Sequence, residues 1–268
     1  MKLRLNNKRK LIVISISVLV LFLTLMFATF SVDSDWNANQ ILQIQNQPVS
    51  DNFCFAAMGD NRGSFDEFPQ IISQLDEQYV FAINGGDLVS YGTFFEYALF
   101  HFQIKKSEIP YLNVVGNHDI TNRGRTIFEK TYGPVNYAFS YADTKFIAID
   151  NAEENITKQT FDWLVTELED DFENKIVFMH VPPFDPRYND KVGHGMEQSA
   201  AELMIVMEEN NVDMVVASHI HGYEEAERNG IQYVITGGAG APLHGAGIYH
   251  YVQICVKDSK FSWEVIKL

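Results

Sequence analysis

The sequence predicts an α/β protein in which two packed mixed sheets are flanked by helices, preceded by one N-terminal transmembrane helix. Three features of the sequence lead to this fold class. Short apolar runs alternate with amphipathic stretches from about residue 52 onward. The last part of the chain contains strand-like runs in succession. Residues 11–30, near the N-terminus, carry no charge.

The composition is that of a globular protein, because 46% of the 268 residues are hydrophobic and 21% are charged. This balance excludes a wholly disordered, collagen-like or coiled-coil chain. The formal net charge is −15 at pH 7, and the chain beyond its basic N-terminus is more acidic still. Because such a surface repels a phosphate backbone, no binding to nucleic acid is expected.

The N-terminus has the pattern of a membrane anchor. Residues 1–10 are basic and are expected to stay in the cytoplasm, and residues 11–30 (LIVISISVLVLFLTLMFATF) are apolar. A run of about twenty residues at about 1.5 Å each crosses a hydrocarbon core of about 30 Å. We interpret it as an uncleaved signal anchor of a single-pass membrane protein with an extracytoplasmic domain. A signal peptide that is cleaved to release a secreted protein is the alternative. Residues 31–51 are polar and are predicted to be a linker.

Five apolar runs beyond residue 52 have the length and composition of strands buried in a parallel sheet. They are FCFAAM (53–58), YVFAI (79–83), YLNVV (111–115), KIVFM (175–179) and MVVAS (214–218). The stretches between them place apolar residues at helical spacing. This spacing predicts helices over 68–75, 95–102, 161–168 and 200–207.

Two stretches depart from this alternation. Residues 136–150 (NYAFSYADTKFIAID) predict a hairpin with its turn at 142–144. After residue 222, the runs EEAER, IQYVITGG, YHYVQICVK and FSWEVIKL predict consecutive antiparallel strands. The sequence shows neither an internal repeat nor a second domain boundary, so residues 52–268 are expected to form one domain.

Cys54 and Cys255 each lie inside an apolar, strand-like run. In an exported protein, two such cysteines can pair in a disulfide. Their apolar surroundings favour the alternative, which is two buried and unreactive thiols.

Polar residues follow each of the five apolar runs. They are, in chain order, Asp60, Asp87, Asn117, His180, and the pair His219 and His221. Because the carboxyl ends of the strands in an open α/β sheet meet at one crevice, we expect these side chains to gather there. Carboxylate, amide oxygen and imidazole ligands suit Mn, Fe or Zn better than a metal that prefers thiolates. Each motif alone is common in turns and loops, and the prediction depends on five occurrences in order.

Four segments resemble the signature blocks of the calcineurin-like metallophosphoesterase superfamily: residues 86–87 (GD), 116–119 (GNHD), 179–183 (MHVPP) and 218–221 (SHIH). Residues 59–62 (GDNR) resemble a variant of its first block. The resemblance extends from about residue 52 to the C-terminus. It implies a four-layer α/β/β/α sandwich with two divalent metal ions in the crevice. It also implies hydrolysis of a phosphate-ester substrate, by a phosphatase or a phosphodiesterase.

The resemblance further implies roles for single residues. Asp87 would bridge both metal ions, Asp60 and His221 would bind the first ion, and Asn117, His180 and His219 would bind the second. His118 would act as the general acid that protonates the leaving oxygen after a metal-activated hydroxide attacks phosphorus. Asp119 follows directly and would orient the imidazole of His118.

The sequence departs from the family pattern at two positions. The first block usually reads Asp-x-His, and here Arg62 stands at the third position. A guanidinium cannot ligate a metal, so the first site keeps three protein ligands and is expected to be the weaker one. Arg62 is predicted either to hold the phosphate as a bidentate donor or to form a structural ion pair. Ser90 stands where many members of the superfamily carry Asp.

The alternative function is that of a non-catalytic metal-binding sensor or scaffold of the same fold, with an impaired first metal site. Four other histidines are not among the predicted metal ligands or the general acid. His194 and His244 lie in glycine-flanked loops and are either exposed loop residues or contacts to the substrate. His101 and His250 are expected to be structural.

Overall fold

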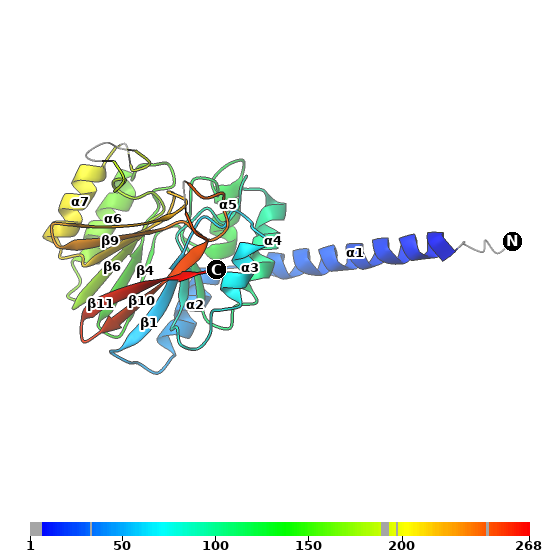
Figure 1. Cartoon of the computed structure of the whole chain (residues 1–268), viewed down its shortest axis with the longest axis horizontal. Coiled ribbons are helices and arrows are strands. Elements are labelled where there is room, and N and C mark those ends of the chain that lie inside the picture. The colour runs from blue at the N-terminus through cyan, green and yellow to red at the C-terminus, as the bar shows by residue number, and fades with distance from the viewer. Residues whose placement is uncertain (1–6, 33, 189–192, 197, 245–246) are drawn as a thin grey trace.

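The structure is a computed structural model that describes residues 7–32, 34–188, 193–196, 198–244 and 247–268. Figure 1 shows a body of strands and helices from which one helix, α1 (Asn7–Val32), projects. The carboxyl terminus lies on the body.

The first sheet contains five strands among the described residues. In spatial order they are β11 (Lys260–Lys267), β10 (His250–Lys257), β1 (Phe53–Met58), β2 (Ala82–Asn84) and β3 (Tyr111–Asn113). β1, β2 and β3 are parallel, and β10 runs antiparallel to both β1 and β11. The three parallel strands are the first three that the apolar runs predicted.

The second sheet contains six described strands. In spatial order they are β4 (Tyr137–Tyr141), β5 (Thr144–Ala148), β6 (Asn174–Phe178), β7 (Met214–Ala217), β9 (Ile231–Thr236) and β8 (Tyr223–Arg228). The four inner strands are parallel, and the two edge strands β4 and β8 are antiparallel to their neighbours. The predicted hairpin is confirmed as β4 and β5.

The C-terminal strands correct one prediction. β8 pairs with β9, and β10 pairs with β11, as expected. However, β9 and β10 are not neighbours, since β9 pairs with β7 in the second sheet and β10 pairs with β1 in the first. The reason is burial: β9 is apolar and almost wholly buried, so it occupies an inner position beside a parallel strand rather than continuing an antiparallel series.

Helices cover the outer face of each sheet. α3 (Glu67–Ile72), α4 (Phe94–Ile104) and α5 (Gly124–Tyr132) contribute to a hydrophobic cluster on the first sheet. α6 (Lys158–Leu168) and α7 (Ala200–Glu209) contribute to a cluster on the second. A third cluster, which includes Phe55, Phe146 and Phe178, lies between the two sheets. Four of these helices were predicted, and α5 was not.

The segment 31–51 is more than the predicted linker, because it contains α2 (Trp36–Gln45), which packs on the edge strand β3. The Asn37 side chain donates to the Asn113 carbonyl (2.9 Å) and accepts from the Asn113 N–H (3.1 Å). The Gln40 Oε1 accepts a second backbone N–H of β3, that of Tyr111 (3.2 Å). These buried amides take the place of a neighbouring strand, which explains why a polar sequence forms part of the domain.

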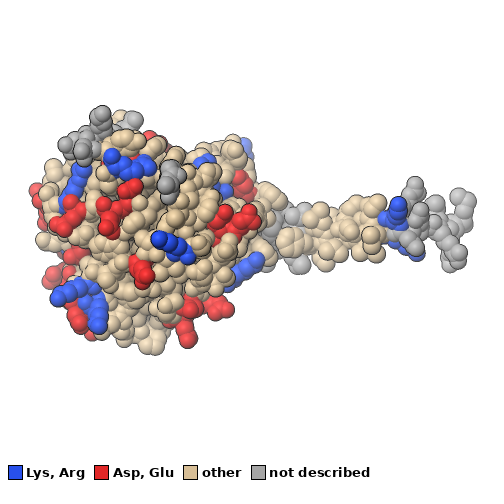
Figure 2. Space-filling view, in the orientation of Figure 1, with Lys and Arg blue, Asp and Glu red and all other residues tan. Residues whose placement is uncertain are grey.

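Helix α1 forms around the apolar run 11–30. Figure 2 shows few charged side chains along its projecting part, apart from basic ones near its free end, where Lys8 and Lys10 lie. Among the helices that the structure describes, none combines the length and the apolar character needed to cross a membrane. The transmembrane helix that the sequence predicts is therefore not confirmed.

Cys54 and Cys255 form a disulfide, which corrects the expectation of two free thiols. Cys54 lies in β1 and Cys255 lies directly opposite in β10, with 4.0 Å between their Cα atoms. The pairing of these two strands brings the thiols together, and neither strand's own sequence determines that register.

Candidate metal centre

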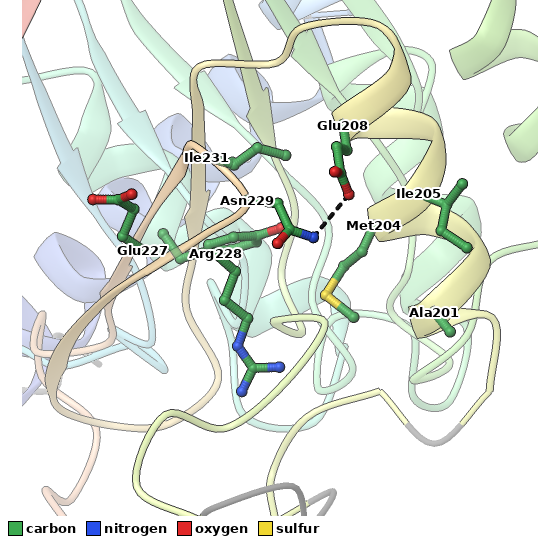
Figure 3. Close-up of a pocket in the computed structure, with 9 residues that line it drawn as sticks. Ala201, Met204, Ile205, Glu208, Glu227, Arg228, Asn229 and Ile231 are labelled. Atoms are coloured by element: carbon green, nitrogen blue, oxygen red, sulfur yellow. Dashed lines mark hydrogen bonds between the residues drawn. The ribbon is translucent and has the colours of Figure 1, made fainter.

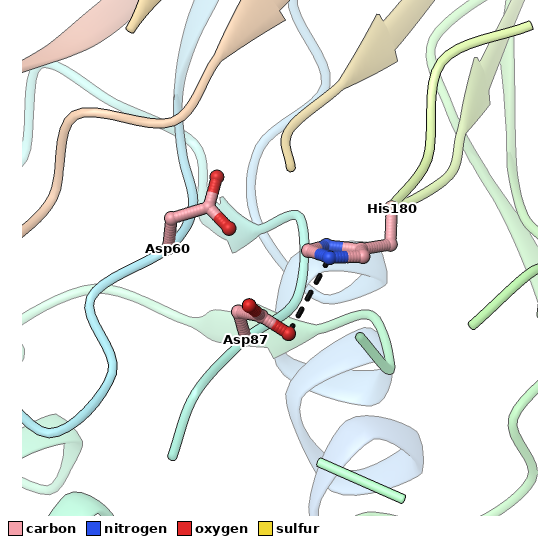
Figure 4. A group of neighbouring side chains, drawn as sticks. All are labelled: Asp60, Asp87 and His180. Carbon is pink, nitrogen blue, oxygen red and sulfur yellow. Dashed lines mark ion pairs between the residues drawn. The ribbon is translucent and has the colours of Figure 1, made fainter. Parts of the chain in front are cut away.

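The six residues that were predicted as metal ligands lie at the carboxyl ends of five strands. Asp60 follows β1, Asp87 follows β2, Asn117 follows β3, His180 follows β6, and His219 and His221 follow β7. Ligand atoms of Asp60, Asp87 and His180 lie within 4.8 Å of one another and are suitably arranged to hold a metal ion (Figure 4). The strand ends of both sheets thus meet at one place.

Four donor atoms form one compact group: His180 Nε2, Asn117 Oδ1, Asp87 Oδ1 and His219 Nδ1. The His180 Nε2 lies 2.9 Å from the Asn117 Oδ1 and 3.4 Å from the Asp87 Oδ1. The His219 Nδ1 lies 3.2 Å from both the Asn117 Oδ1 and the His180 Nε2. Ligands about 2.0–2.1 Å from a tetrahedral ion lie roughly 3.3 Å from one another. The spacing of this group therefore fits a single cation at its centre.

Backbone carbonyls fix which imidazole nitrogen is available to a metal. The His180 Nδ1 donates to the Gly85 carbonyl (2.9 Å), and the His221 Nδ1 donates to the Pro242 carbonyl (2.9 Å). Since a carbonyl only accepts, these nitrogens carry the protons, and the lone pairs are on Nε2. The His221 Nε2 lies 3.8 Å from the Asp60 Oδ1, as expected for two ligands of one ion.

Two buried carboxylates have oxygen atoms without a hydrogen-bond partner. Both oxygens of Asp60 and the Oδ2 of Asp87 form no hydrogen bond with any residue that the structure describes. Burial raises the pKa of Asp60 well above its usual value, and the neighbouring Asp87 raises it further. Burial also raises the pKa of Asp87. Unpaired buried carboxylates are costly, and a divalent cation removes that cost, so these residues fit a metal ion.

The two buried ligand histidines are held in the neutral form. Burial lowers the pKa of His180 to about 3, and it lowers the pKa of His219 to about 3 as well. A neutral imidazole is the form that binds a metal. These two imidazoles are therefore ready for a cation at neutral pH without first losing a proton.

The backbone turns sharply at the strand ends. Asp60, Asp87, His219 and His221 have positive φ angles between 52° and 69°, which residues other than glycine seldom adopt. Such conformations are strained, and they cluster at functional sites. Gly86 (φ 105°) is needed for close packing, because a Cβ there would lie 2.6 Å from the His180 Nδ1.

His118 lies beside the donor group. Its Nε2 is 3.9 Å from the Asp87 Oδ2, and its side chain is 29% exposed. The Nδ1 lies 2.9 Å from the Arg62 Nη2 and 2.8 Å from the Ser90 carbonyl oxygen. The backbone carbonyl of Ser90 thus makes the contact to the His118 imidazole that was predicted for the carboxylate of Asp119. Among the described residues, Arg62 forms no ion pair with an acid, and its buried Nε has no hydrogen-bond partner.

Asp119 does not orient the imidazole of His118, which corrects the role predicted for it. Its buried carboxylate accepts the N–H groups of Val89 (3.1 Å) and Gly116 (2.8 Å). These bonds join the turn after β2 to the turn after β3. Proximity in sequence was misleading here, because the Asp119 side chain points to the backbone rather than to its neighbour.

Asn151, at the end of β5, was missed by the sequence analysis. Its Oδ1 accepts the N–H groups of His180 (3.0 Å) and Val181 (3.1 Å), and its Nδ2 donates to the Val181 carbonyl. Asn151 therefore fixes the backbone of a candidate metal ligand. The sequence contained a signal for this residue, because β5 is a further apolar run that polar residues follow. That run was interpreted only as part of a hairpin.

The remaining histidines divide into two groups. His101 packs on Trp36 with 4.8 Å between ring centroids, and the buried His250 lies 3.2 Å from the Thr236 hydroxyl, so both are structural as expected. His194 and His244 lie next to the ligand histidines and are exposed.

A separate pocket of about 570 Å³ lies between α7 and the turn that joins β8 to β9 (Figure 3). Its lining includes Met204, Ile205 and Tyr233, and Asn229 donates to Glu208 across it (2.8 Å). None of the predicted site residues lines this pocket. The metal-ligating side chains at the strand ends, rather than the volume of a pocket, therefore identify the candidate site.

Comparison with known proteins agrees with this assignment. The family model for calcineurin-like phosphoesterases matches residues 53–223. Purple acid phosphatase 5 from Arabidopsis thaliana is 27% identical over 148 residues, which are 54% of this chain and 36% of that protein. The match thus spans about a third of the length of that relative.

Solved structures with the same fold include a dimetal phosphatase from Danio rerio. It has 13% sequence identity and a TM-score of 0.65, over 82% of this chain and 97% of that chain. GAP50, the anchor in the inner membrane complex of Plasmodium, has 15% identity and a TM-score of 0.62, over 81% and 84% of the two chains. At these identities the likeness shows the fold alone.

Proposed function

The chain belongs to the calcineurin-like phosphoesterase family, and from this membership we propose that it hydrolyses phosphate esters as a phosphatase or phosphodiesterase. The observation that supports this most strongly is the gathering of Asp60, Asp87 and His180 at the strand ends, with carboxylate oxygens buried and unpartnered. A site of this kind would be costly in a protein that binds no cation.

The proposed cofactor is a pair of divalent ions, such as Mn, Fe or Zn. Asp87 would lie between them, with Asn117, His180 and His219 on one side and Asp60 and His221 on the other. When bound, the ions supply Lewis acidity and an activated nucleophile for attack on phosphorus. The first position has the smaller protein ligand set, because Arg62 stands where the family pattern usually has a histidine.

His118 is the proposed general acid. In the protonated imidazole, the Nδ1–H would donate to the Ser90 carbonyl, and the Nε2–H would face the site and give its proton to the leaving oxygen. The guanidinium of Arg62 would bind the phosphate oxygens, since its Nε–H has no partner among the described residues. The side chains that act on the substrate thus lie on one side of the metal ligands.

An extracytoplasmic location is a separate proposal. Residues 1–30 have the pattern of a signal anchor or of a cleaved signal peptide. The disulfide of Cys54 and Cys255 supports an oxidising compartment. Membrane fractionation with N-terminal sequencing would test this proposal, and a full-length protein in the cytosolic fraction would contradict it.

Hydrolysis of an aryl phosphate and of an aryl phosphodiester in the presence of Mn²⁺ would test the function. We expect His118→Ala to lower kcat by about 10²–10⁴-fold, the usual contribution of a general acid, with an unchanged metal content. Turnover that is equal to that of the unmodified protein would exclude this role. Two bound ions without any turnover would favour the alternative of a metal-binding sensor.

A further inference from the structure

Two asparagines that the proposed function does not use are buried next to candidate metal ligands. Asn61 directly follows Asp60 in the turn after β1, and Asn84 is the last residue of β2, close to Asp87 in the sequence. Both asparagines are 0% exposed. A buried amide lowers stability unless its polar atoms form hydrogen bonds, so the partners of these two side chains show what the amides hold together.

Hydrogen bonds determine how both amides are oriented. The Gly86 N–H donates to the Asn84 Oδ1 (3.1 Å), so the other atom of that amide, Nδ2, is the donor. It donates to the Asn61 Oδ1 (2.9 Å) and to the Tyr111 hydroxyl (3.2 Å). The Asn61 Nδ2 in turn donates to the Leu88 carbonyl (2.9 Å). The two amides therefore form one continuous chain of hydrogen bonds from the N–H of Gly86 to the carbonyl of Leu88.

This chain of hydrogen bonds is fixed on both sides of Asp87, because Gly86 and Leu88 are its neighbours in the sequence. Backbone bonds join the same two turns. The Asp60 N–H donates to the Gly86 carbonyl (2.9 Å). The Arg62 N–H donates to the Asp87 carbonyl (2.9 Å). The turn that carries Asp60 and the turn that carries Asp87 are thus attached to each other through main chain and side chains together.

The backbone of both turns is strained. Asp60 has a φ angle of 58°, Arg62 has one of 44°, and Asp87 has one of 57°. Residues other than glycine seldom adopt such angles, and they keep them only where the surrounding contacts hold them in place. The bonds of Asn61 and Asn84 are contacts of this kind, because they connect one strained turn to the other.

We propose that Asn61 and Asn84, here called the asparagine clamp, are positioning residues that hold Asp60 and Asp87 together for the first of the two metal ions. Neither asparagine is a proposed ligand, and both act through the turns that carry the ligands. This inference rests on the proposed function, because it assumes that two ions bind as proposed there.

The first ion depends most on the asparagine clamp. Asp60 and His221 are the ligands proposed for that ion alone, and Asp60 lies in one of the two clamped turns. The remaining ligands of the second ion lie outside both turns: Asn117, His180 and His219. Loss of the clamp therefore moves a ligand of the first ion, whereas only the shared Asp87 connects the clamp to the second.

Calorimetric titration of the metal-free full chain with Mn²⁺ would test this proposal. We expect Asn61→Ala and Asn84→Ala each to weaken the weaker binding step by about 10–100-fold, as when the support of a ligand is lost, and the tighter step by less. The double variant should lose little more than either single variant, because the amides act through one chain of hydrogen bonds. Losses that simply add, or an unchanged weaker step, would overturn the proposal.

Asn37→Ala is the matched control, because it also removes a buried amide that bonds to backbone, but on α2 and outside both turns. Denaturant unfolding of the metal-free variants would compare their stabilities. We expect Asn37→Ala to be destabilised as the clamp variants are, and yet to bind both ions as the unmodified protein does. If Asn37→Ala weakens metal binding as much as Asn61→Ala, general instability explains the loss and the proposal is refuted.

Hydrogen exchange tests the clamp without any variant. The Gly86 N–H bonds to the Asn84 side chain, so we expect it to exchange slowly in the metal-free, unmodified protein. Exchange as fast as in an unfolded chain would show that the clamp does not form before the metal binds, and would refute it. Neither measurement depends on turnover, so the expected results would support the clamp even if the protein hydrolyses no ester.

Discussion

At the scale of single residues, Asp60 shows what burial without a partner does. An acid whose pKa is raised by folding binds its proton more tightly in the folded state. Its cost to stability is therefore absent below the unfolded pKa of about 3.9, grows as pH rises from that value to the raised pKa of the folded state, and is constant above it. The sequence located this carboxylate at a strand end, but only the packed structure shows that its oxygens form no hydrogen bond with the described residues.

We expect Asp60→Asn to stabilise the metal-free protein, and the gain to increase from pH 4 to pH 8. A gain of about 1 kcal/mol corresponds to a rise in Tm of roughly 2–4 °C for a domain of this size. Thermal unfolding in the presence of a chelator would measure it, with the exposed Asp171→Asn as the control. Added metal should raise the Tm of the unmodified protein more than that of the variant. A Tm gain that does not depend on pH would contradict this explanation.

Asn151 is a positioning residue, because it holds the backbone of His180 without facing the metal position. We expect Asn151→Ala to weaken metal binding by about 10–100-fold, as is usual when the support of a ligand is lost. Asn151→Asp keeps the accepting oxygen and should lose less. Metal titration followed by calorimetry would measure both. If the metal-free protein is destabilised while metal affinity is unchanged, Asn151 is merely structural.

At the scale of elements, the success of the prediction for each helix or strand depended on which side chains that element buries. Apolar runs and helical spacing predicted the five buried strands and four of the helices on the sheets. α4 begins with a capping box formed by Thr93 and Glu96, in agreement with its predicted position. α2 escaped prediction because two of its three buried side chains, those of Asn37 and Gln40, are amides. The hydrophobic pattern cannot distinguish an amide that binds a strand edge from one that faces water.

We expect Asn37→Ala to destabilise the domain by about 2 kcal/mol, because it leaves the buried N–H of Asn113 in β3 without its partner, while the Asn113 carbonyl keeps only the Tyr137 hydroxyl. Asn39→Ala is the matched control on the same helix, since Asn39 is exposed and bonds only to the Ser34 carbonyl. Denaturant unfolding would compare them. Equal effects of the two variants would mean that α2 does not protect the sheet edge. Metal affinity should be the same in both.

At the scale of the whole molecule, the disulfide connects residues 201 positions apart and joins the first strand of the domain to the penultimate one. A cross-link that closes so long a loop restricts the unfolded chain strongly. We expect Cys54→Ser/Cys255→Ser to lower the free energy of unfolding by about 2–5 kcal/mol. Denaturant unfolding with and without a reductant would measure this. Two titratable thiols in the unreduced, denatured protein would show that the bond does not form.

The sequence by itself determined the apolar strands and the polar residues that follow them, because both are local patterns of neighbouring residues. Those patterns were enough to identify Asp60, Asp87 and His180 as candidate ligands. The tertiary structure alone decided how the strands divide between two sheets, which pairs Cys54 with Cys255 and separates β9 from β10. It also decided that Asp119 binds backbone and that Asn151 supports His180. These features depend on contacts between distant segments, and such contacts are set by the packing of the whole chain rather than by any local period.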